Sequence, residues 1–286
     1  HISGWEPTWY MGLKAAEKAI EKAGINAEDI GIVIGCTISS DFHTPAMANI
    51  IQGKLGAVNA LSFDLNAACS GFVYAVDTAR RFLETDENMK YAIVVASENL
   101  SRVVDFNDRN TCILFGDGAA AAVISKSDTL YSSYLGSDGS IANVLFARSV
   151  NTNEKFAAES DFNDGFEGNN MHAIYQNGKE VYKFAVKALP HAFEKSAEKI
   201  GISADEIDLF VPHQANLRIL ETAAKNLGVS MDKFFVSLDK FGNTSSASIP
   251  IALDIALEEN KIKNGDKICL VGFGAGLTSA SIIMEF

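Results

Sequence analysis

Short apolar runs alternate with longer amphipathic segments along most of the chain, a pattern typical of strands and helices that follow one another. Gly31–Cys36 and Tyr91–Ser97 are almost wholly apolar, and their short length predicts buried strands. A helix is expected to begin near Thr8 and to end at Gly24, because glycine commonly terminates helices. This alternation predicts mixed or parallel sheets that are covered by helices on both faces.

The pattern occurs twice. Residues 20–30 read IEKAGINAEDI, and residues 197–207, which lie 177 positions later, read AEKIGISADEI. Repetition at a fixed offset indicates that two parts of the chain fold alike. The strands predicted at this offset are Gly31–Cys36 and Asp208–Pro212, and Tyr91–Ser97 and Ile268–Gly274. Each strand of the second pair is followed later by a β-rich run, Ala119–Ser125 or Thr278–Phe286.

Each half also contains an Ala-rich helix, which begins near Cys69 in the first half and near Asn243 in the second. Helices that are apolar on every face belong between layers of a protein. We therefore expect an α/β fold in which two similar halves, residues 1–128 and 129–286, pack around two central helices in five layers, αβαβα. Only seven residues precede the first long helix of the first half, so its opening strand and hairpin are expected to be absent from this chain.

Composition and charge exclude several functions. The 286 residues are 48% hydrophobic and carry a net charge of −12, which disfavours nucleic acid and anionic membranes as partners. No apolar run reaches the roughly 18 residues of a membrane span, and no basic-then-apolar leader suggests export. The four cysteines lie far apart without a C-x-x-C pattern, which fits a reducing cytoplasm better than a zinc or disulfide scaffold.

Cys69 is the first candidate for chemistry, because it follows an apolar run and opens the first central helix. The positive end of a helix dipole stabilises an anion by about 0.3–2 kcal/mol. This effect predicts a thiol pKa between about 7 and 8. A buried, inert thiol is the alternative, and it is the expected state of Cys36, Cys112 and Cys269, which lie in apolar runs.

Three further features are expected to meet Cys69. His213 lies where a predicted strand ends, the position at which active sites gather in α/β folds. Asn243 is either a helix N-cap or, if the repeat places the two central helices side by side, a second side chain in the pocket of Cys69. The turn Gly272–Gly276 can present backbone N–H groups to a reacting carbonyl oxygen. No cluster has metal-ligand spacing, so no metal is expected.

Four motifs together resemble the thiolase superfamily of condensing enzymes, and most closely 3-oxoacyl-[acyl-carrier-protein] synthase III. They are DLNAACSGF around Cys69, FGDGAAAAVI from Phe115, VPHQANLR around His213 and FGNTSSAS around Asn243. The resemblance runs from about Thr8 to the end of the chain. Elongating synthases have histidine in place of this asparagine and thiolases have a second cysteine. The asparagine therefore resembles the initiating synthase or its chalcone-synthase-like relatives.

The resemblance implies the initiating condensation of type II fatty-acid synthesis. Cys69 would accept an acyl group from acyl-CoA, while the backbone N–H groups of Cys69 and Ala275 hold the oxyanion. His213 and Asn243 would then donate hydrogen bonds to the thioester of malonyl-[acyl-carrier-protein], which loses CO2 and attacks the acyl group. The implied partners are acyl-CoA, the carrier protein and a second copy of the chain in a homodimer, with no cofactor.

Other residues are implied by position alone. The CoA and pantetheine contacts would be Arg109, Ala215 and Asn216. Thr44 would close the acyl pocket of a neighbouring subunit. A basic patch for the acidic carrier protein would comprise Arg218, Lys225 and Lys183, although solvated surface charge is an equal alternative for it.

Three other functions are compatible with parts of the sequence. A related Claisen enzyme of secondary metabolism would use the same three residues. A Cys-His-Asn hydrolase would release free acid from an acyl-enzyme. A non-catalytic acyl- or carrier-binding paralogue would form no acyl-enzyme at all.

Overall fold

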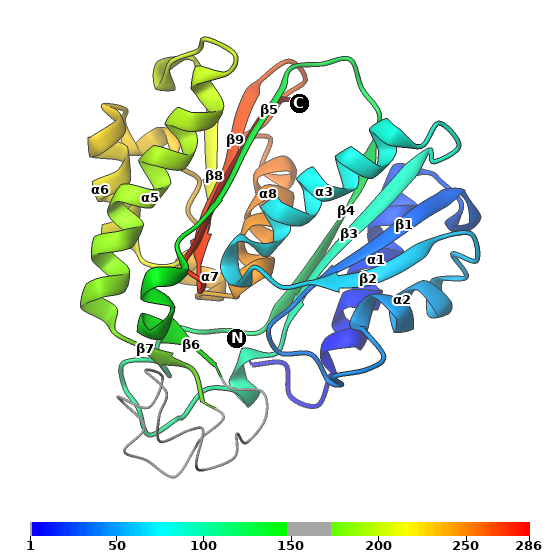
Figure 1. Ribbon diagram of the computed structural model, residues 1–286, viewed down its shortest axis with the longest axis horizontal. Coiled ribbons are helices and arrows are strands. Elements are labelled where there is room, and N and C mark those ends of the chain that lie inside the picture. The colour runs from blue at the N-terminus through cyan, green and yellow to red at the C-terminus, as the bar shows by residue number, and fades with distance from the viewer. Residues whose placement is uncertain (1, 148–172) are drawn as a thin grey trace.

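Two four-stranded sheets form the framework of the computed structural model, which describes residues 2–147 and 173–286 (Figure 1). The first sheet has the order β2-β1-β3-β4. β1 pairs in parallel with β2 and β3, and β3 pairs with β4 in antiparallel fashion. The strands of this sheet are β1 (Ile30–Cys36), β2 (Leu61–Leu65), β3 (Tyr91–Glu98) and β4 (Gly118–Ser125).

The second sheet repeats this arrangement in the order β5-β10-β9-β8. β8 and β9 are parallel, and β10 is antiparallel to both β9 and β5, so β8, β9 and β10 correspond to β1, β3 and β4. In the described part of the chain, no strand lies beside β4 where β5 lies beside β10. The strands are β5 (Tyr131–Ser137), β8 (Leu209–Pro212), β9 (Lys267–Gly274) and β10 (Thr278–Glu285), with a separate small sheet of β6 (Leu145–Phe146) and β7 (Tyr175–Gln176).

Two helices lie between the sheets, and the others cover the outer faces (Figure 1). The central helices are α3 (Gly71–Thr85) and α8 (Ser248–Glu258), and each contacts strands of both sheets. Their apolar side chains form the central core, so the predicted five-layer order is observed. The outer helices are α1 (Thr8–Ala23) and α2 (Met47–Leu55) on the first sheet, and α5 (Gly178–Glu198) and α6 (Leu217–Leu227) beside the second, with a short α7 (Leu238–Phe241) before α8.

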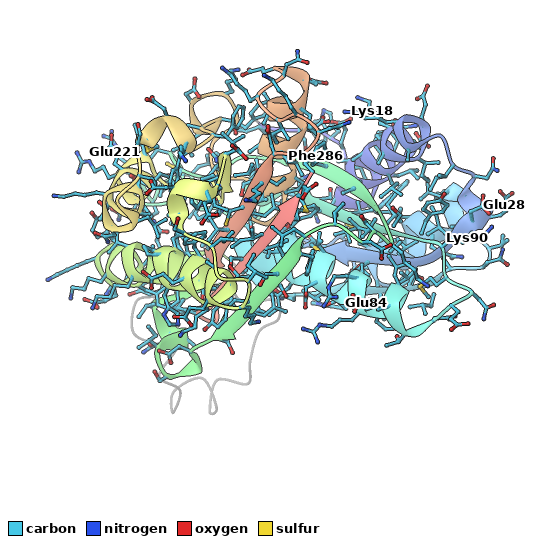
Figure 2. The ribbon with its side chains drawn as sticks, turned by 90° about the horizontal axis from the view of Figure 1, so that it is seen from above. Lys18, Glu28, Glu84, Lys90, Glu221 and Phe286 are labelled. Atoms are coloured by element: carbon cyan, nitrogen blue, oxygen red, sulfur yellow. The ribbon has the colours of Figure 1, made fainter. Side chains whose placement is uncertain are left out.

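Hydrophobic patterning accounts for these layers. The outer helices bury one face against a sheet and leave charged residues in solvent, as expected for amphipathic helices. Figure 2 shows Lys18, Glu28 and Glu221 at the periphery of the molecule. Gly24 and Gly201 both have left-handed backbone, with φ of 66° and 69°, at the predicted ends of α1 and α5.

The repeat extends to the turns before the central helices. The chain forms a 3₁₀ turn at Ala68–Ser70 and another at Ser245–Ala247, again 177 positions apart, and both begin with left-handed backbone. The structural counterpart of Cys69 is therefore Ser246, and Asn243 lies three residues before it. The expectation that the second central helix begins near Asn243 was wrong by five residues, because a left-handed residue cannot continue into an α-helix and the turn must be completed first.

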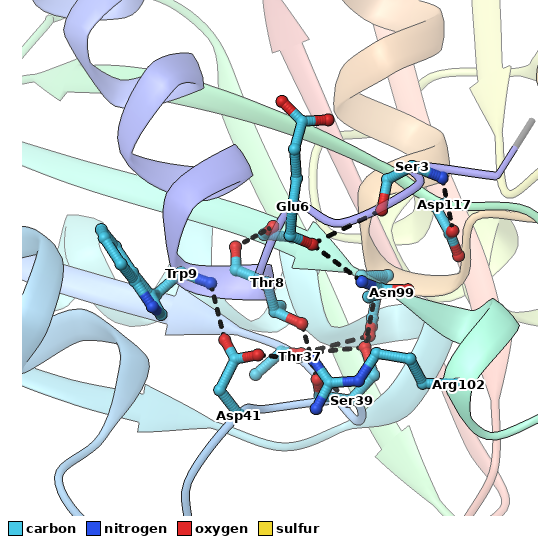
Figure 3. A network of polar contacts seen from close by, with 12 residues as sticks. Ser3, Glu6, Thr8, Trp9, Thr37, Ser39, Asp41, Asn99, Arg102 and Asp117 are labelled. Atoms are coloured by element: carbon cyan, nitrogen blue, oxygen red, sulfur yellow. Dashed lines mark hydrogen bonds and ion pairs between the residues drawn. The ribbon is translucent and has the colours of Figure 1, made fainter.

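Hydrogen bonds attach the start of α1 to the loop after β1 (Figure 3). The Thr8 hydroxyl donates to the carbonyl oxygen of Ser39 at 2.7 Å, and the backbone N–H of Trp9 donates to the Asp41 carboxylate at 2.9 Å. The carboxylate thereby pairs with one of the N–H groups that a helix start leaves without an intrahelical partner. These bonds hold the first outer layer at the carboxyl end of the first sheet.

Candidate active site

The structure brings Cys69, His213 and Asn243 together around one cavity at the junction of the two halves. The cavity has a volume of about 590 Å³. The turn Gly274–Gly276 between β9 and β10 and the small β6–β7 sheet complete its walls. Cys69, His213 and Asn243 meet here because both central helices begin, and β8 ends, at this place.

Cys69 lies in the 3₁₀ turn directly before α3 and is only 8% exposed. Its thiol donates a hydrogen bond to the Ser245 hydroxyl, with 3.4 Å between sulfur and oxygen. Burial raises the pKa of the thiol to about 12, although the Ser245 hydroxyl, which can donate to a thiolate, acts in the opposite direction. The lowered pKa predicted from the helix position is therefore wrong, because desolvation of a thiolate outweighs the stabilisation at the helix start.

His213 follows β8 directly, and its backbone N–H donates to the Val271 carbonyl oxygen of β9 at 2.8 Å. The ring packs edge-on against Phe273 with 5.4 Å between ring centroids. Its Nδ1 atom lies 2.6 Å from the Ser248 hydroxyl oxygen. Burial lowers the pKa of the imidazole to about 3, so the ring is neutral at physiological pH.

Asn243 is held in place by backbone bonds to the segment that precedes β4. Its N–H donates to the Leu114 carbonyl oxygen at 2.8 Å, and its carbonyl oxygen accepts from the Gly116 N–H at 2.9 Å. In the side chain, Oδ1 accepts from the Ser245 N–H at 2.8 Å. Since the carbonyl end of the amide is thus occupied, the NH2 group is the end that can donate toward the cavity.

The glycine turn approaches Cys69 closely, as the oxyanion prediction requires. A Cβ atom on Gly274 would lie 2.6 Å from the Cys69 backbone nitrogen and 3.1 Å from that of Ser70. Only glycine permits this approach of β9 to the nucleophile turn. Ala275, whose N–H is the second predicted oxyanion donor, borders the cavity beside Cys69.

The remaining predicted contacts divide into two groups. Ala215 and Asn216, the expected pantetheine contacts, border the cavity. Arg109 and Thr44 are exposed and do not border it. A role of Thr44 in the pocket of a second subunit stays a prediction.

The predicted basic patch lies on two helices that pack against each other, α5 and α6. Arg218 and Lys225 are exposed on α6, and Lys183 is exposed on α5. Lys183 also forms an ion pair with Glu180, with 2.7 Å between nitrogen and oxygen. Its charge is therefore partly neutralised, whereas Arg218 and Lys225 form no ion pair within the described residues.

A buried carboxylate beside the site was missed by sequence reasoning. Glu98 ends β3 and is fully buried, and it accepts hydrogen bonds from the hydroxyls of Ser39 and Ser246, both at 2.7 Å. Burial raises the pKa of this carboxyl, while these hydrogen bonds oppose the shift. Ser246 thus links the turn of the second half to the sheet of the first. The sequence signal that could have identified Glu98 was a single acidic residue at the end of an apolar strand.

Across the described ranges, no group of three or more His, Cys, Asp or Glu side chains is placed to hold a metal ion. Two similar α/β halves with a thiol, a neutral imidazole and a carboxamide donor around one cavity are the features of a thiolase-like condensing enzyme.

Comparison with known proteins agrees with this class. The family profile described as 3-oxoacyl-[acyl-carrier-protein (ACP)] synthase III matches residues 63–139, and that of its C-terminal part matches residues 197–286. The chain is 46% identical to beta-ketoacyl-[acyl-carrier-protein] synthase III of Clostridium acetobutylicum, with 100% of this chain and 86% of the relative aligned. The chain is 44% identical to the synthase III of Natranaerobius thermophilus, with 98% of this chain and 84% of the relative aligned.

Solved structures give the same result. The 3-oxoacyl-[acyl-carrier-protein] synthase III of Aquifex aeolicus superposes with a TM-score of 0.89 at 35% identity, covering 100% of this chain and 87% of the other. A priming β-ketosynthase of the R1128 polyketide pathway superposes with a TM-score of 0.85 at 33% identity, covering 99% of this chain and 83% of the other. The chain belongs to the 3-oxoacyl-[acyl-carrier-protein] synthase III family. The predicted thiolase-like fold is confirmed, and the chain is an acyltransferase of the condensing-enzyme class.

Proposed function

We propose that the cavity carries out the initiating condensation of fatty-acid synthesis, with acyl-CoA and malonyl-[acyl-carrier-protein] as substrates. The observation that carries this proposal is the convergence of Cys69, His213 and Asn243 on one cavity. The thiol supplies a nucleophile, and the neutral ring and the amide supply two hydrogen-bond donors that do not titrate near neutral pH. The 46% identity to a synthase III supports this pathway over secondary metabolism.

In the first half-reaction, the Cys69 sulfur attacks the thioester carbonyl carbon of acyl-CoA. A carbon–sulfur bond forms to Cys69, the bond to the CoA sulfur breaks, and CoA leaves as a thiol with the proton that Cys69 loses. The N–H groups of Cys69 and Ala275 stabilise the oxyanion. Burial raises the pKa of the thiol and so disfavours the free thiolate, and the proton must be lost within this half-reaction.

In the second half-reaction, the carbon–carbon bond to the malonyl carboxylate breaks and CO2 leaves. The electron pair forms an enolate, whose oxygen accepts hydrogen bonds from His213 and Asn243. The enolate carbon attacks the acyl carbonyl carbon, the bond to the Cys69 sulfur breaks, and the released thiolate takes up one proton. The product is 3-oxoacyl-[acyl-carrier-protein], and the thiol is regenerated.

The proposal extends to partners and organisation. Ala215, Asn216 and Arg109 would contact the pantetheine and nucleotide of CoA, and Thr44 would reach the pocket of the second subunit of a homodimer. The patch of Arg218, Lys225 and Lys183 would bind the acidic carrier protein. Residues 1–128 and 129–286 would form the two halves. None of the described helices is both long and apolar enough to span a membrane. We propose that the enzyme acts in the cytoplasm, a reducing compartment that suits its four free cysteines.

Mass spectrometry of the intact protein after incubation with a panel of acyl-CoAs tests the nucleophile and the starter group together. The wild type is expected to gain one acyl mass, and Cys69→Ser none. Rapid release of free acid would instead indicate a hydrolase, and no adduct with any acyl-CoA would indicate a non-catalytic protein. Addition of malonyl-[acyl-carrier-protein] should then discharge the adduct, whereas discharge only by malonyl-CoA would indicate the enzyme of secondary metabolism.

An Asn243→Asp variant separates the two half-reactions. A carboxylate cannot donate a hydrogen bond, and it would repel the enolate. We expect acylation of Cys69 to remain within a few-fold of the wild type, while release of CO2 from malonyl-[acyl-carrier-protein] falls by about 10²-fold or more. Equal loss of both steps would contradict the role assigned to Asn243.

A further inference from the structure

The two ring nitrogens of His213 have different surroundings. Nδ1 faces the Ser248 hydroxyl oxygen at 2.6 Å, which is a short hydrogen bond between two buried groups. His213 borders the cavity, whereas Ser248 does not. Nε2 is therefore the ring nitrogen that remains for a substrate, and Ser248 can act on the substrate only through the ring.

The hydrogen-bond partners of Ser248 decide which nitrogen carries the proton. A serine hydroxyl has one hydrogen to donate and two lone pairs that accept. One lone pair faces the backbone N–H of Gln214 at 3.4 Å. Within the described residues, Nδ1 of His213 is the only other partner of this hydroxyl.

If Nδ1 carried the proton and donated to Ser248, the buried hydroxyl would receive two hydrogen bonds and its own hydrogen would have no acceptor among the described residues. Such a group is costly inside a protein. If Nδ1 is bare, the Ser248 hydroxyl donates to it and every polar atom of the pair has a partner. A neutral imidazole carries one proton, so this proton is then on Nε2.

We propose that Ser248 is a positioning residue that keeps His213 in the Nε2–H tautomer, so that the ring presents a hydrogen-bond donor to the cavity. The Nδ1–H tautomer would present a bare nitrogen, which would repel a thioester or enolate oxygen. The link to decarboxylation rests on the proposed function, but the tautomer itself does not depend on it.

Neighbouring residues hold His213 and Ser248 in this arrangement. Ser248 is the first residue of α8, in the central layer, and is 2% exposed. The Gln214 side chain is 1% exposed and anchors the chain next to His213, because its NH2 group donates to the carbonyl oxygens of Pro212 and Phe235. These bonds fix the backbone that carries the His213 ring beside the Ser248 hydroxyl.

Nitrogen-15 NMR of protein labelled at histidine tests the tautomer directly, because protonated and bare ring nitrogens have well-separated shifts. The His213 signals are assigned by their absence in His213→Gln. The wild type at pH 7 is expected to show a protonated Nε2 and a bare Nδ1. A protonated Nδ1 in the wild type would overturn the proposal, whether or not the chain has condensing activity.

Variants test the part that Ser248 plays. Ser248→Ala should convert His213 wholly or partly to the Nδ1–H tautomer, and Ser248→Thr, which keeps a hydroxyl, should retain Nε2–H. Ser246→Ala is the matched control, since Ser246 is equally buried in the preceding turn but bonds to Glu98. It should leave the tautomer unchanged. An unchanged tautomer in folded Ser248→Ala would overturn the role of Ser248.

Activity provides the second measurement. In Ser248→Ala we expect kcat for CO2 release from malonyl-[acyl-carrier-protein] to fall by roughly 10- to 100-fold with KM nearly unchanged, because the lost donor acts in the transition state. Ser248→Thr should recover most of this loss. Acylation by acyl-CoA should change less than about threefold, because His213 is not assigned to that step. A fall in acylation as large as that in CO2 release would indicate a structural role and contradict the proposal.

Discussion

Acid stability provides a quantitative test of the neutral imidazole on which the proposed chemistry depends. His213 is 1% exposed, and burial lowers its pKa from the usual 6.5 to about 3. The unfolded chain therefore binds a proton below pH 6.5 that the folded protein excludes. The stability that this histidine contributes is fully present above pH 6.5 and is lost progressively as the pH falls toward 3.

The size of the effect follows from the shift. One pKa unit corresponds to about 1.4 kcal/mol, so a change from pH 7 to pH 5 should remove about 2 kcal/mol through His213 alone. His213→Gln cannot bind this proton. Other titrating groups act in both proteins and cancel in the difference. The free energy of unfolding of the variant minus that of the wild type should therefore be about 2 kcal/mol larger at pH 5 than at pH 7.

The free energy of unfolding is measured by urea denaturation of both proteins at the two pH values. His191→Gln, which removes an exposed imidazole from α5, is the matched control and should change this difference far less. If His213→Gln and the wild type lose the same stability between pH 7 and pH 5, the ring is already protonated or accessible. The lowered pKa of His213, and with it the claim that burial keeps the ring neutral, would then be refuted.

Three other predictions follow from the site. Because burial raises the pKa of Cys69 to about 12, its rate of alkylation by iodoacetamide should rise about tenfold per pH unit from pH 7 to 10. Cys69→Ser gives the background rate of the other cysteines. A plateau near pH 8 would show that the helix start, rather than burial, determines the pKa of this thiol. Gly274→Ala should displace the nucleophile turn, slow acylation and cost about 1–3 kcal/mol of stability, and normal acylation would argue against the oxyanion geometry. Arg218→Glu should slow the carrier-dependent step but not acylation by acyl-CoA. Lys18→Glu, which changes an exposed residue of α1, is the control and should affect neither step. Equal loss in both steps of Arg218→Glu would exclude the basic patch.

Much of the architecture could be read from the sequence, because layers are specified by local periodicity. Short apolar runs can hydrogen-bond their backbone groups and bury both of their faces as strands of a covered sheet. The helices α3 and α8 are apolar enough to need a central position. The repeat at an offset of about 177 residues placed β1 with β8 and β3 with β9. The motifs around Cys69, His213 and Asn243 also named the residues that meet at the cavity, since each lies at a strand end or helix start.

Only the tertiary structure decided the electrostatic state of these groups. A position at a helix start predicts a more acidic thiol, but the surrounding layers remove water, and this desolvation reverses the direction for Cys69. The contacts of Ser245, Ser248 and Glu98 also depend on where the second turn meets the first half. Local patterns determine which face of an element is buried, whereas solvation and hydrogen-bond partners depend on residues far away along the chain.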